Sequence, residues 1–207
     1  MSTAASGSEA RQAPQEEFDD LGVLGERLWR ELGRAAQDRH HEWRQPVLAT
    51  LCPDEGPQAR TVVLREVDVS SRMLLIYTDA RSPKVAQLQA DPRASLVCWS
   101  RATGWQLRLA GRIEVRADGL DVTSRWALMR HTRSAQDYLS PRPPGAVVDA
   151  AERAQVTPIT TVAPRAHFAV LRFQVERMDW LALGPGGHRR ARFEVSGAEL
   201  PGQWCCP

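Results

Sequence analysis

The sequence is short of lysine, and this shortage narrows the kinds of ligand it suits. Lys84 is the sole lysine in 207 residues, so nearly all of the 27 positive charges are arginine, and the net charge is only +2. These charges form no basic stripe with interleaved aromatic residues, which argues against a nucleic-acid partner. The arginine excess suits recognition of anions by guanidinium groups, and it suits equally the codon bias of a GC-rich genome.

The four cysteines form no metal-binding or redox motif. None of them lies in a CxxC or Cys/His spacing, and the histidines form no ligand set, so we expect no metal site. Cys98 lies in an apolar run and is predicted to be buried. Cys205 and Cys206 are expected to be free thiols, with a strained vicinal disulfide as the alternative.

Long apolar runs are missing as well. No run approaches the roughly 18 residues of a transmembrane helix, and the N-terminal segment has no apolar signal region. We therefore expect a cytoplasmic protein without a membrane partner. Residues 1–17 are small, polar and charged, which predicts a disordered tail, and residues 18–207 are predicted to form a single domain.

Hydrophobic periodicity predicts strands with a few helices between them. Leucines at three- and four-residue spacing predict a helix from residue 21, capped by Asp19 or Asp20. A short helix is expected to begin at Pro83 and to end before Asp91, because Ser82 suits the N-cap and Pro83 the first helical position. Further helices are predicted over 118–129 and 132–139. Strands are predicted at 46–53, 58–68, 73–79, 94–100, 105–116, 167–183 and 188–195.

Seven strands in hairpins favour an antiparallel barrel over a parallel βαβ sheet. GxGxxG and GxxxxGK[ST] loops are absent, so the usual nucleotide-binding folds have no support. An anion site is nevertheless indicated by Arg60 and Arg65, which bracket a predicted strand, and by Ser82 and Lys84 at a helix start. Unpaired N–H groups at a helix N-terminus, with cationic side chains, are typical phosphate ligands. Ordinary surface arginines and a routine Ser-Pro helix start are the alternative.

Five segments, taken in order, resemble the flavin-binding split-barrel family of pyridoxamine 5′-phosphate oxidases. They are RTVVLR (60–65), YT (77–78), ARSPKVAQL (80–88), GWQLRLAGRIE (104–114) and DWLALGPGGHRRARFEV (179–195), and GQWCCP (202–207) lies where that family often ends in a tryptophan-containing strand. Within the family they are most similar to bacterial proteins of unassigned substrate. The resemblance implies a mainly β fold, α+β by content: an FMN-binding split barrel, antiparallel and Greek-key-like, with peripheral helices.

The resemblance also implies a set of cofactor-binding residues. Arg60, Ser82 and Lys84 would bind the 5′-phosphate, and Tyr77 and Thr78 would hold ribityl and phosphate atoms. The cofactor would be FMN, held at the interface of a homodimer. The complete implied set is Arg60, Thr61, Val62, Val63, Leu64, Arg65, Tyr77, Thr78, Ser82, Lys84, Gln106, Trp180 and Arg192.

The other members of this set would surround the flavin ring. Arg65 would lie near the ring or the substrate, and Gln106 would hydrogen-bond the pyrimidine edge. Trp180 and Arg192 would reach the cofactor from the second subunit. Pro83 stands where the family usually has an arginine, so one phosphate ligand of the family is missing, and nearby Arg81 is the candidate to replace it.

The resemblance breaks down at the substrate. The oxidase proper grips its substrate phosphate with a tyrosine, an arginine and a serine, where this chain has Ala127, His131 and Ala135. An alanine supplies no donor to a phosphate, so a vitamin B6 phosphate is not the expected substrate. His188 and Arg190 stand where the family has an Arg-x-His pair, with the residue types exchanged, and they are candidates for substrate binding.

The function that the resemblance implies is an FMN-dependent oxidoreductase, in which flavin N5 accepts a hydride from a small-molecule substrate. Arg65 and Arg192 are candidates for the positive field that stabilises the reduced ring, and Arg65 and Arg190 are candidate catalytic residues. Two alternatives stay open: a haem-binding split barrel with His188 as ligand, and a non-enzymatic flavin-binding protein. A deazaflavin in place of FMN is a further variant.

Overall fold

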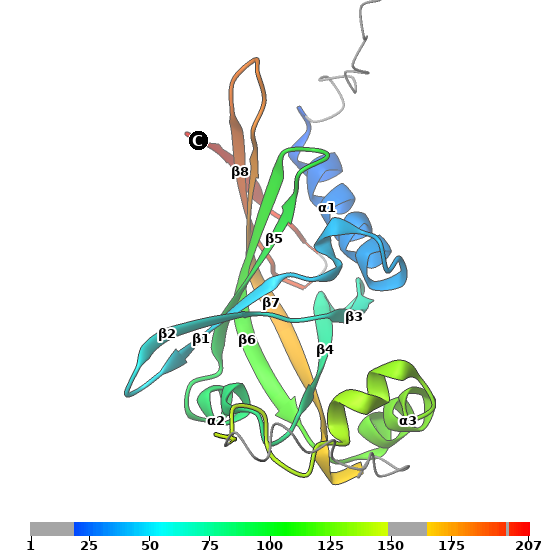
Figure 1. The fold of residues 1–207 in the computed structure, drawn as a ribbon. Coiled ribbons are helices and arrows are strands. Elements are labelled where there is room, and N and C mark those ends of the chain that lie inside the picture. Colours follow the sequence, from blue (N-terminus) through cyan, green and yellow to red (C-terminus); the bar gives the residue numbers. More distant parts are fainter. Residues whose placement is uncertain (1–18, 149–164, 198) are drawn as a thin grey trace, which may run out of the picture.

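One antiparallel sheet of nine strands, curled around an apolar core, organises the molecule (Figure 1). The computed structural model describes residues 19–148, 165–197 and 199–207, so the predicted tail, residues 1–17, lies outside the described residues. The antiparallel split barrel expected from the sequence is confirmed. The strands are β1 Val47–Cys52, β2 Gly56–Thr61, β3 Leu64–Asp68, β4 Met73–Asp79, β5 Arg93–Ser100, β6 Trp105–Arg116, β7 Phe168–Ala182, β8 Arg189–Glu194 and β9 Gly202–Cys205.

The sheet branches at its longest strand. The main path runs β2-β1-β5-β6-β7-β4-β3, while β8 pairs with β7 and β9 pairs with β8. The first half of β7 pairs with β4 and the second half with β8, so two short strands share one long neighbour. The β5–β6 hairpin and the long strand β7, which pairs with β6, form the central wall of the barrel.

The prediction of one strand over residues 58–68 is wrong. The strand is interrupted at Val62 and Val63. As a result β2 pairs with β1 at one end of the sheet path, and β3 pairs with β4 at the other. A continuous strand cannot pair with both edges at once, and the break resolves this conflict. The Val62 amide donates to the carbonyl of Pro46 (3.0 Å). The break and the C-terminal strand β9 raise the predicted seven strands to nine.

In the described part of the chain three α-helices cover the barrel: α1 Leu21–Gln37, α2 Pro83–Ala90 and α3 Leu120–Met129. Asp20 is the N-cap of α1, and its carboxylate accepts from the Val23 amide (2.9 Å). The predicted helix over 132–139 is instead a short 3₁₀ segment, Arg133–Tyr138, because the prolines that begin at Pro141 prevent its continuation. No helix in the described segments is long and apolar enough to cross a membrane.

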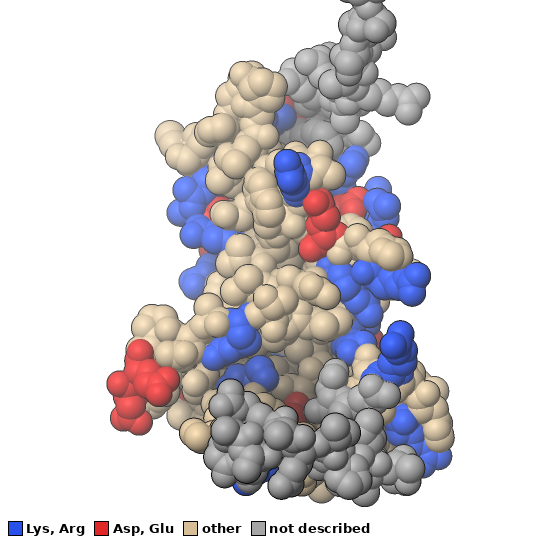
Figure 2. Space-filling view, in the orientation of Figure 1, with Lys and Arg blue, Asp and Glu red and all other residues tan. Residues whose placement is uncertain are grey.

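Two apolar cores position the site. The main core lies inside the barrel and includes leucines of α1, as the leucine spacing predicts. A smaller core lies between α3 and strands β4 and β7, where Phe168 meets Tyr77, Trp126 and Tyr138 with ring centroids 5.1, 5.3 and 5.5 Å apart. Cys98 is buried as predicted. Figure 2 shows basic side chains in several separate groups on the face in view.

The close pairing of β6 with β7 leaves no room for a side chain at Gly111. A Cβ there would lie 2.0 Å from the carbonyl oxygen of Gln174, next to a bulge in the β6–β7 pairing. We predict that Gly111→Ala lowers the free energy of unfolding by about 1–3 kcal/mol, measured by urea denaturation. Gly33→Ala is the control: a Cβ there meets nothing within 4 Å, so it should raise stability by up to about 1 kcal/mol. Equal stability of the two variants would contradict this account.

Candidate functional site

Polar side chains meet at the start of α2. Lys84 Nζ donates to Thr78 Oγ1 (2.9 Å) and to Ser82 Oγ (2.6 Å). Ser82 is the N-cap residue and Pro83 the first helical residue, as predicted. The Ser82 side chain makes no capping bond to the helix backbone, since its oxygen accepts from Lys84. Lys84 therefore depends on two hydroxyl groups for its position.

Arg60 enters the same place from β2. Its register partner on β1, Leu48, is fully buried, so the Arg60 side chain lies on the inner face of the sheet. Nη1 donates to Thr50 Oγ1 (2.5 Å) and Nη2 donates to Gln87 Oε1 on α2 (3.1 Å). Thr50 also donates to Gln87 (2.7 Å). Thr50 and Gln87 were not predicted as site residues, because only the folded chain brings them to Arg60.

Arg60, Thr78, Ser82 and Lys84 are called the anion cluster below. Burial lowers the pKa of Lys84 and the nearby charge of Arg60 lowers it further, against an opposing effect of Asp79. Burial also lowers the pKa of Arg60. Among the described residues the partners of both cations are hydroxyl, amide and carbonyl groups, since Asp79 is paired with Arg81 (2.7 Å). Two half-buried cations whose hydrogen-bond partners among the described residues are uncharged suit a dianionic ligand.

Arg65 lies on β3, after the strand interruption at Val62 and Val63, and its side chain is beside Tyr77. Its guanidinium carbon is 5.7 Å from the centroid of the Tyr77 ring and Nη2 donates to Ser134 Oγ (3.2 Å), while its buried Nε finds no partner in the described part of the chain. Tyr77 donates its hydroxyl hydrogen bond to Glu66, which also accepts two bonds from Arg125 (2.8 and 3.0 Å). Burial and the Glu66 carboxylate raise the pKa of Tyr77, so Tyr77 is a neutral phenol. Arg65 keeps a donor unused.

Gln106 and Arg192 lie on the opposite face of the sheet, called the outer face here. Gln106 pairs with Trp99 on β5 and with Leu181 on β7, and Leu181 pairs with Arg190 on β8. Trp99, Gln106, Leu181 and Arg190 thus form one row across four strands, called the outer row below. The anion cluster and the outer row stand on different faces of one sheet.

Asp179 organises the charges next to the outer row. Its carboxylate accepts from Arg108 (2.6 Å), from Arg190 (2.8 and 3.0 Å) and from Arg192 (3.1 Å). Burial acts to raise the pKa of Asp179, but the bonds from Arg190 and Arg108 outweigh it and lower the value to about 2. One carboxylate faces three guanidinium groups, so the outer face carries an excess of positive charge.

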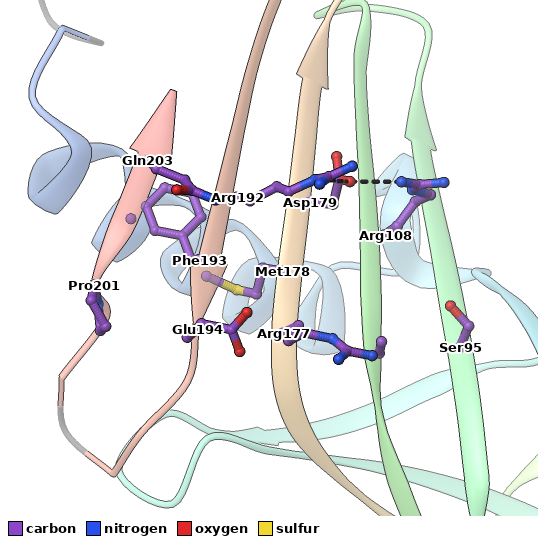
Figure 3. Close-up of a pocket in the computed structure, with 12 residues that line it drawn as sticks. Ser95, Arg108, Arg177, Met178, Asp179, Arg192, Phe193, Glu194, Pro201 and Gln203 are labelled. Carbon is purple, nitrogen blue, oxygen red and sulfur yellow. Dashed lines mark hydrogen bonds and ion pairs between the residues drawn. The ribbon is translucent and has the colours of Figure 1, made fainter. Parts of the chain in front are cut away.

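Figure 3 shows Asp179 and Arg192 at a pocket of about 610 Å³ that spans β5 to β9 on this side of the molecule. Asp179 was missed by the sequence reasoning. The signal was present, because Asp179 is the acidic residue of the arginine-rich tail segment DWLALGPGGHRRARF.

Trp180 does not share the outer face. It is 1% exposed and packs in the main core against Trp105 and Trp204, with ring centroids 5.3 and 6.4 Å apart. Strand alternation requires this, since Asp179 and Leu181 on either side face outwards. The burial speaks against direct cofactor contact by Trp180, and its predicted role stays a prediction.

The remaining predicted site residues lie at the strand interruption between β2 and β3 and in the turn between β7 and β8. Val62 and Leu64 are core residues, Val63 is half-buried and Thr61 is exposed. His188 is exposed in the turn before β8. Val62, Val63 and Leu64 have apolar side chains, so they could contact a cofactor through backbone groups and van der Waals packing only.

The segment compared with the substrate grip of the oxidase offers few donors. Ala127 and His131 are exposed, and His131 Nε2 accepts from Arg130 Nε (2.9 Å). Ala135 is buried, while its neighbour Ser134 bonds to Arg65 (3.2 Å). This geometry offers no three-residue phosphate grip at these positions.

Known proteins agree with the geometry. Residues 26–117 match the family described as pyridoxamine 5′-phosphate oxidase, FMN-binding domain. A pyridoxine/pyridoxamine 5′-phosphate oxidase of Thermosynechococcus vestitus is 36% identical over 107 residues, which make up 52% of this chain and 45% of that protein. Pyridoxine/pyridoxamine 5′-phosphate oxidase 2 of Arabidopsis thaliana is 31% identical over 144 residues, 66% of this chain and 72% of the plant protein. The chain belongs to this FMN-binding family.

Solved structures place this family member in the split-barrel fold. PhzG from Burkholderia lata 383, in complex with tetrahydrophenazine-1-carboxylic acid, has a TM-score of 0.72 at 21% identity, covering 97% of this chain and 100% of that one. An FMN-binding protein of Nostoc punctiforme has a TM-score of 0.67 at 22% identity, covering 90% and 97%. The family match spans the anion cluster and Gln106 but ends before the last hairpin. The chain spans less than half the length of the Thermosynechococcus relative.

Asp179 should make stability depend on pH. Its folded pKa of about 2 lies below the unfolded value of about 3.9, so its stabilising effect is present above pH ~4 and is lost as the pH falls towards 2. We predict that Asp179→Asn lowers the free energy of unfolding by about 2 kcal/mol at pH 7 and by much less near pH 2. Denaturant unfolding at several pH values measures this.

Asp19→Asn is the matched control for this experiment. It removes a carboxylate from the ion pair between exposed Asp19 and Arg189 (2.7 Å), and exposed pairs contribute little. A loss for Asp179→Asn that does not change with pH would show that the loss is not electrostatic.

Proposed function

We propose that this protein is a homodimeric, FMN-dependent oxidoreductase acting on a small molecule. The observation that carries the proposal is the anion cluster, in which half-buried Arg60 and Lys84 bond to uncharged groups while the nearby Asp79 is paired with Arg81. A 5′-phosphate is a dianion of matching charge, and the start of α2 adds unpaired N–H groups. The residues present therefore fit the phosphate end of FMN, and membership of the FMN-binding family supports the same cofactor.

The positions of the predicted residues support a second copy. Arg60 lies on the inner face of the sheet, whereas Gln106 and Arg192 lie on the outer face. A cofactor bound to all three in one chain would have to pass through the sheet. Two copies related by a two-fold axis remove this conflict, because each outer face then faces the other copy's phosphate site.

The residues of the chain would bind and polarise the cofactor, and bound FMN would supply the hydride acceptor. Lys84, Arg60, Thr78 and Ser82 would hold the phosphate. Arg65 has an unused donor beside Tyr77, and it would place positive charge where the ring gains electron density. Gln106 would orient the ring through its amide group.

The substrate is proposed to be a small organic molecule without a phosphate. Ala127 and Ala135 support this, because neither side chain can donate a hydrogen bond. Arg190, on the outer row, is half-buried and paired with Asp179 (2.8 Å), and it would bind a carboxylate in exchange for part of that pair. PhzG, which has the same fold, was solved with a ring carboxylic acid, so reduced ring carboxylates are the first compounds to assay.

A non-enzymatic flavin-binding role is the second candidate, and the same two alanines favour it. Anaerobic reduction separates the two functions. An oxidoreductase should lose its flavin absorbance with a nicotinamide cofactor or a reduced ring carboxylate, and regain it in air, whereas a storage protein should respond to neither. The haem alternative depends on His188, exposed in the turn before β8, and a Soret band that is lost in His188→Ala would support it.

FMN binding tests the anion cluster directly. We expect the purified protein to bind FMN more tightly than riboflavin, which lacks the phosphate. Lys84→Met should weaken FMN binding by about 10- to 100-fold, as expected for a charge-assisted bond, and should leave riboflavin binding nearly unchanged. Calorimetric or fluorescence titration with each ligand measures both constants.

Arg93→Met serves as the control, since it removes the same charge at the far end of α2, where Arg93 is exposed and paired with Asp91. Its affinity for FMN should equal that of the unmodified protein. Equal affinity of the unmodified protein for FMN and riboflavin, or no binding of either, would sink the proposal.

A further inference from the structure

Trp99 is an aromatic residue that the fold of one chain does not use. It is 45% exposed, the highest value among the seven tryptophans of the sequence. Trp204 is almost as exposed, at 41%, but it packs against Arg189 and Trp180. Within the described residues the Trp99 ring has no aromatic or cationic neighbour in contact. An indole left half in water on a central strand indicates that something else covers it.

The sheet register places Trp99 next to a predicted cofactor residue. Trp99 on β5 is the direct cross-strand partner of Gln106 on β6. Side chains directly opposite each other on one face have Cβ atoms about 4.5–5.5 Å apart. A ring whose edge bonds to the Gln106 amide therefore lies within reach of the Trp99 indole.

The surroundings of Trp99 favour a second copy of this chain as the covering partner. Val47 pairs with Val97 on β5, so it shares the outer face with Trp99, and it is 40% exposed. Leu183, 43% exposed, follows the outer-row residue Leu181 on the same face. Exposed apolar residues gathered on one sheet face are typical of a protein interface. The same face carries the guanidinium groups around Asp179, and it would meet the other copy's site.

We propose that Trp99 forms a wall of the cofactor pocket of the second copy, where its indole packs against the isoalloxazine ring of an FMN whose phosphate is bound by Arg60 and Lys84 of that other copy. The inference rests on the proposed function and adds to it a ring contact that comes from the partner. The flat, electron-poor ring of a flavin and the electron-rich indole suit face-to-face or offset stacking. Trp99 then holds the ring of the cofactor, while the anion cluster of the other copy holds its phosphate.

Flavin emission tests the contact without reference to activity. An indole in contact with a flavin quenches its fluorescence, so bound FMN should emit weakly in the unmodified protein. In Trp99→Ala we expect the emission of bound FMN to rise several-fold and the dissociation constant to increase by about tenfold, the effect typical of removing a stacked aromatic side chain. Trp99→Phe should retain most of the affinity and lose most of the quenching.

Trp204→Phe is the matched control, because Trp204 is almost as exposed as Trp99 but packs against the core residue Trp180. Its bound FMN should stay quenched. If bound FMN has the same emission in Trp99→Ala as in the unmodified protein, the stacking proposal is wrong even though the protein binds FMN. If the unmodified protein binds no FMN, both the proposed function and this inference are overturned. Far-ultraviolet circular dichroism confirms that the variants fold.

Mixed dimers test whether the contact crosses between copies. Chains carrying Trp99→Ala and chains carrying Lys84→Met, with different affinity tags, are refolded together and the mixed species is purified. If each site takes Lys84 from one copy and Trp99 from the other, one site has both defects and the other has none. The mixed dimer should then bind one FMN with unmodified affinity and quenched emission. If both residues of a site come from the same copy, each site has one defect and no such FMN is seen, which would overturn the contribution in trans.

Discussion

The covalent join between the two edges of the sheet is the constraint on which the rest of the structure depends. β2 ends one side of the strand path and β3 ends the other, yet only Val62 and Val63 separate them in the chain. Three peptide units span at most about 11 Å, so the sheet must curl until its edges meet. This closure sends Arg60 towards α2 and leaves Arg65 beside Tyr77. The segment from Arg60 to Arg65 therefore places one cation in the anion cluster and another beside Tyr77.

Positive charge left without a matching carboxylate is the second organising feature. In the anion cluster Arg60 and Lys84 bond to hydroxyl and amide groups. On the outer face Asp179 is shared among three arginines. Buried or half-buried cations are costly unless a counter-charge is at hand. Both places are therefore suited to anionic ligands, and their positions on opposite faces make a second copy the simplest way for one ligand to meet both.

The local parts of the fold were predictable, and the non-local parts were not. The start of α2 at Pro83 and the cap of α1 at Asp20 follow from neighbouring residues, because capping is decided within one helical turn. The break at Val62 was missed, since TVVLREV has the same β propensity whether it forms one strand or two. Trp180 was assigned to the cofactor from its place in a motif, although the alternation of its strand turns it into the core. Thr50 and Gln87 reach Arg60 only through the folded chain.

The sequence by itself determined the class of fold, the positions of most strands along the chain and the cations that the candidate phosphate site contains. These depend on residue type and short-range spacing, which a linear sequence records. The tertiary structure alone decided which face of the sheet each side chain occupies across strands, and hence that Lys84 and Gln106 stand on opposite faces while Trp99 stands beside Gln106. The reason is physical: strand register is set by pairing between distant segments, and a shift of one residue moves a side chain to the other face.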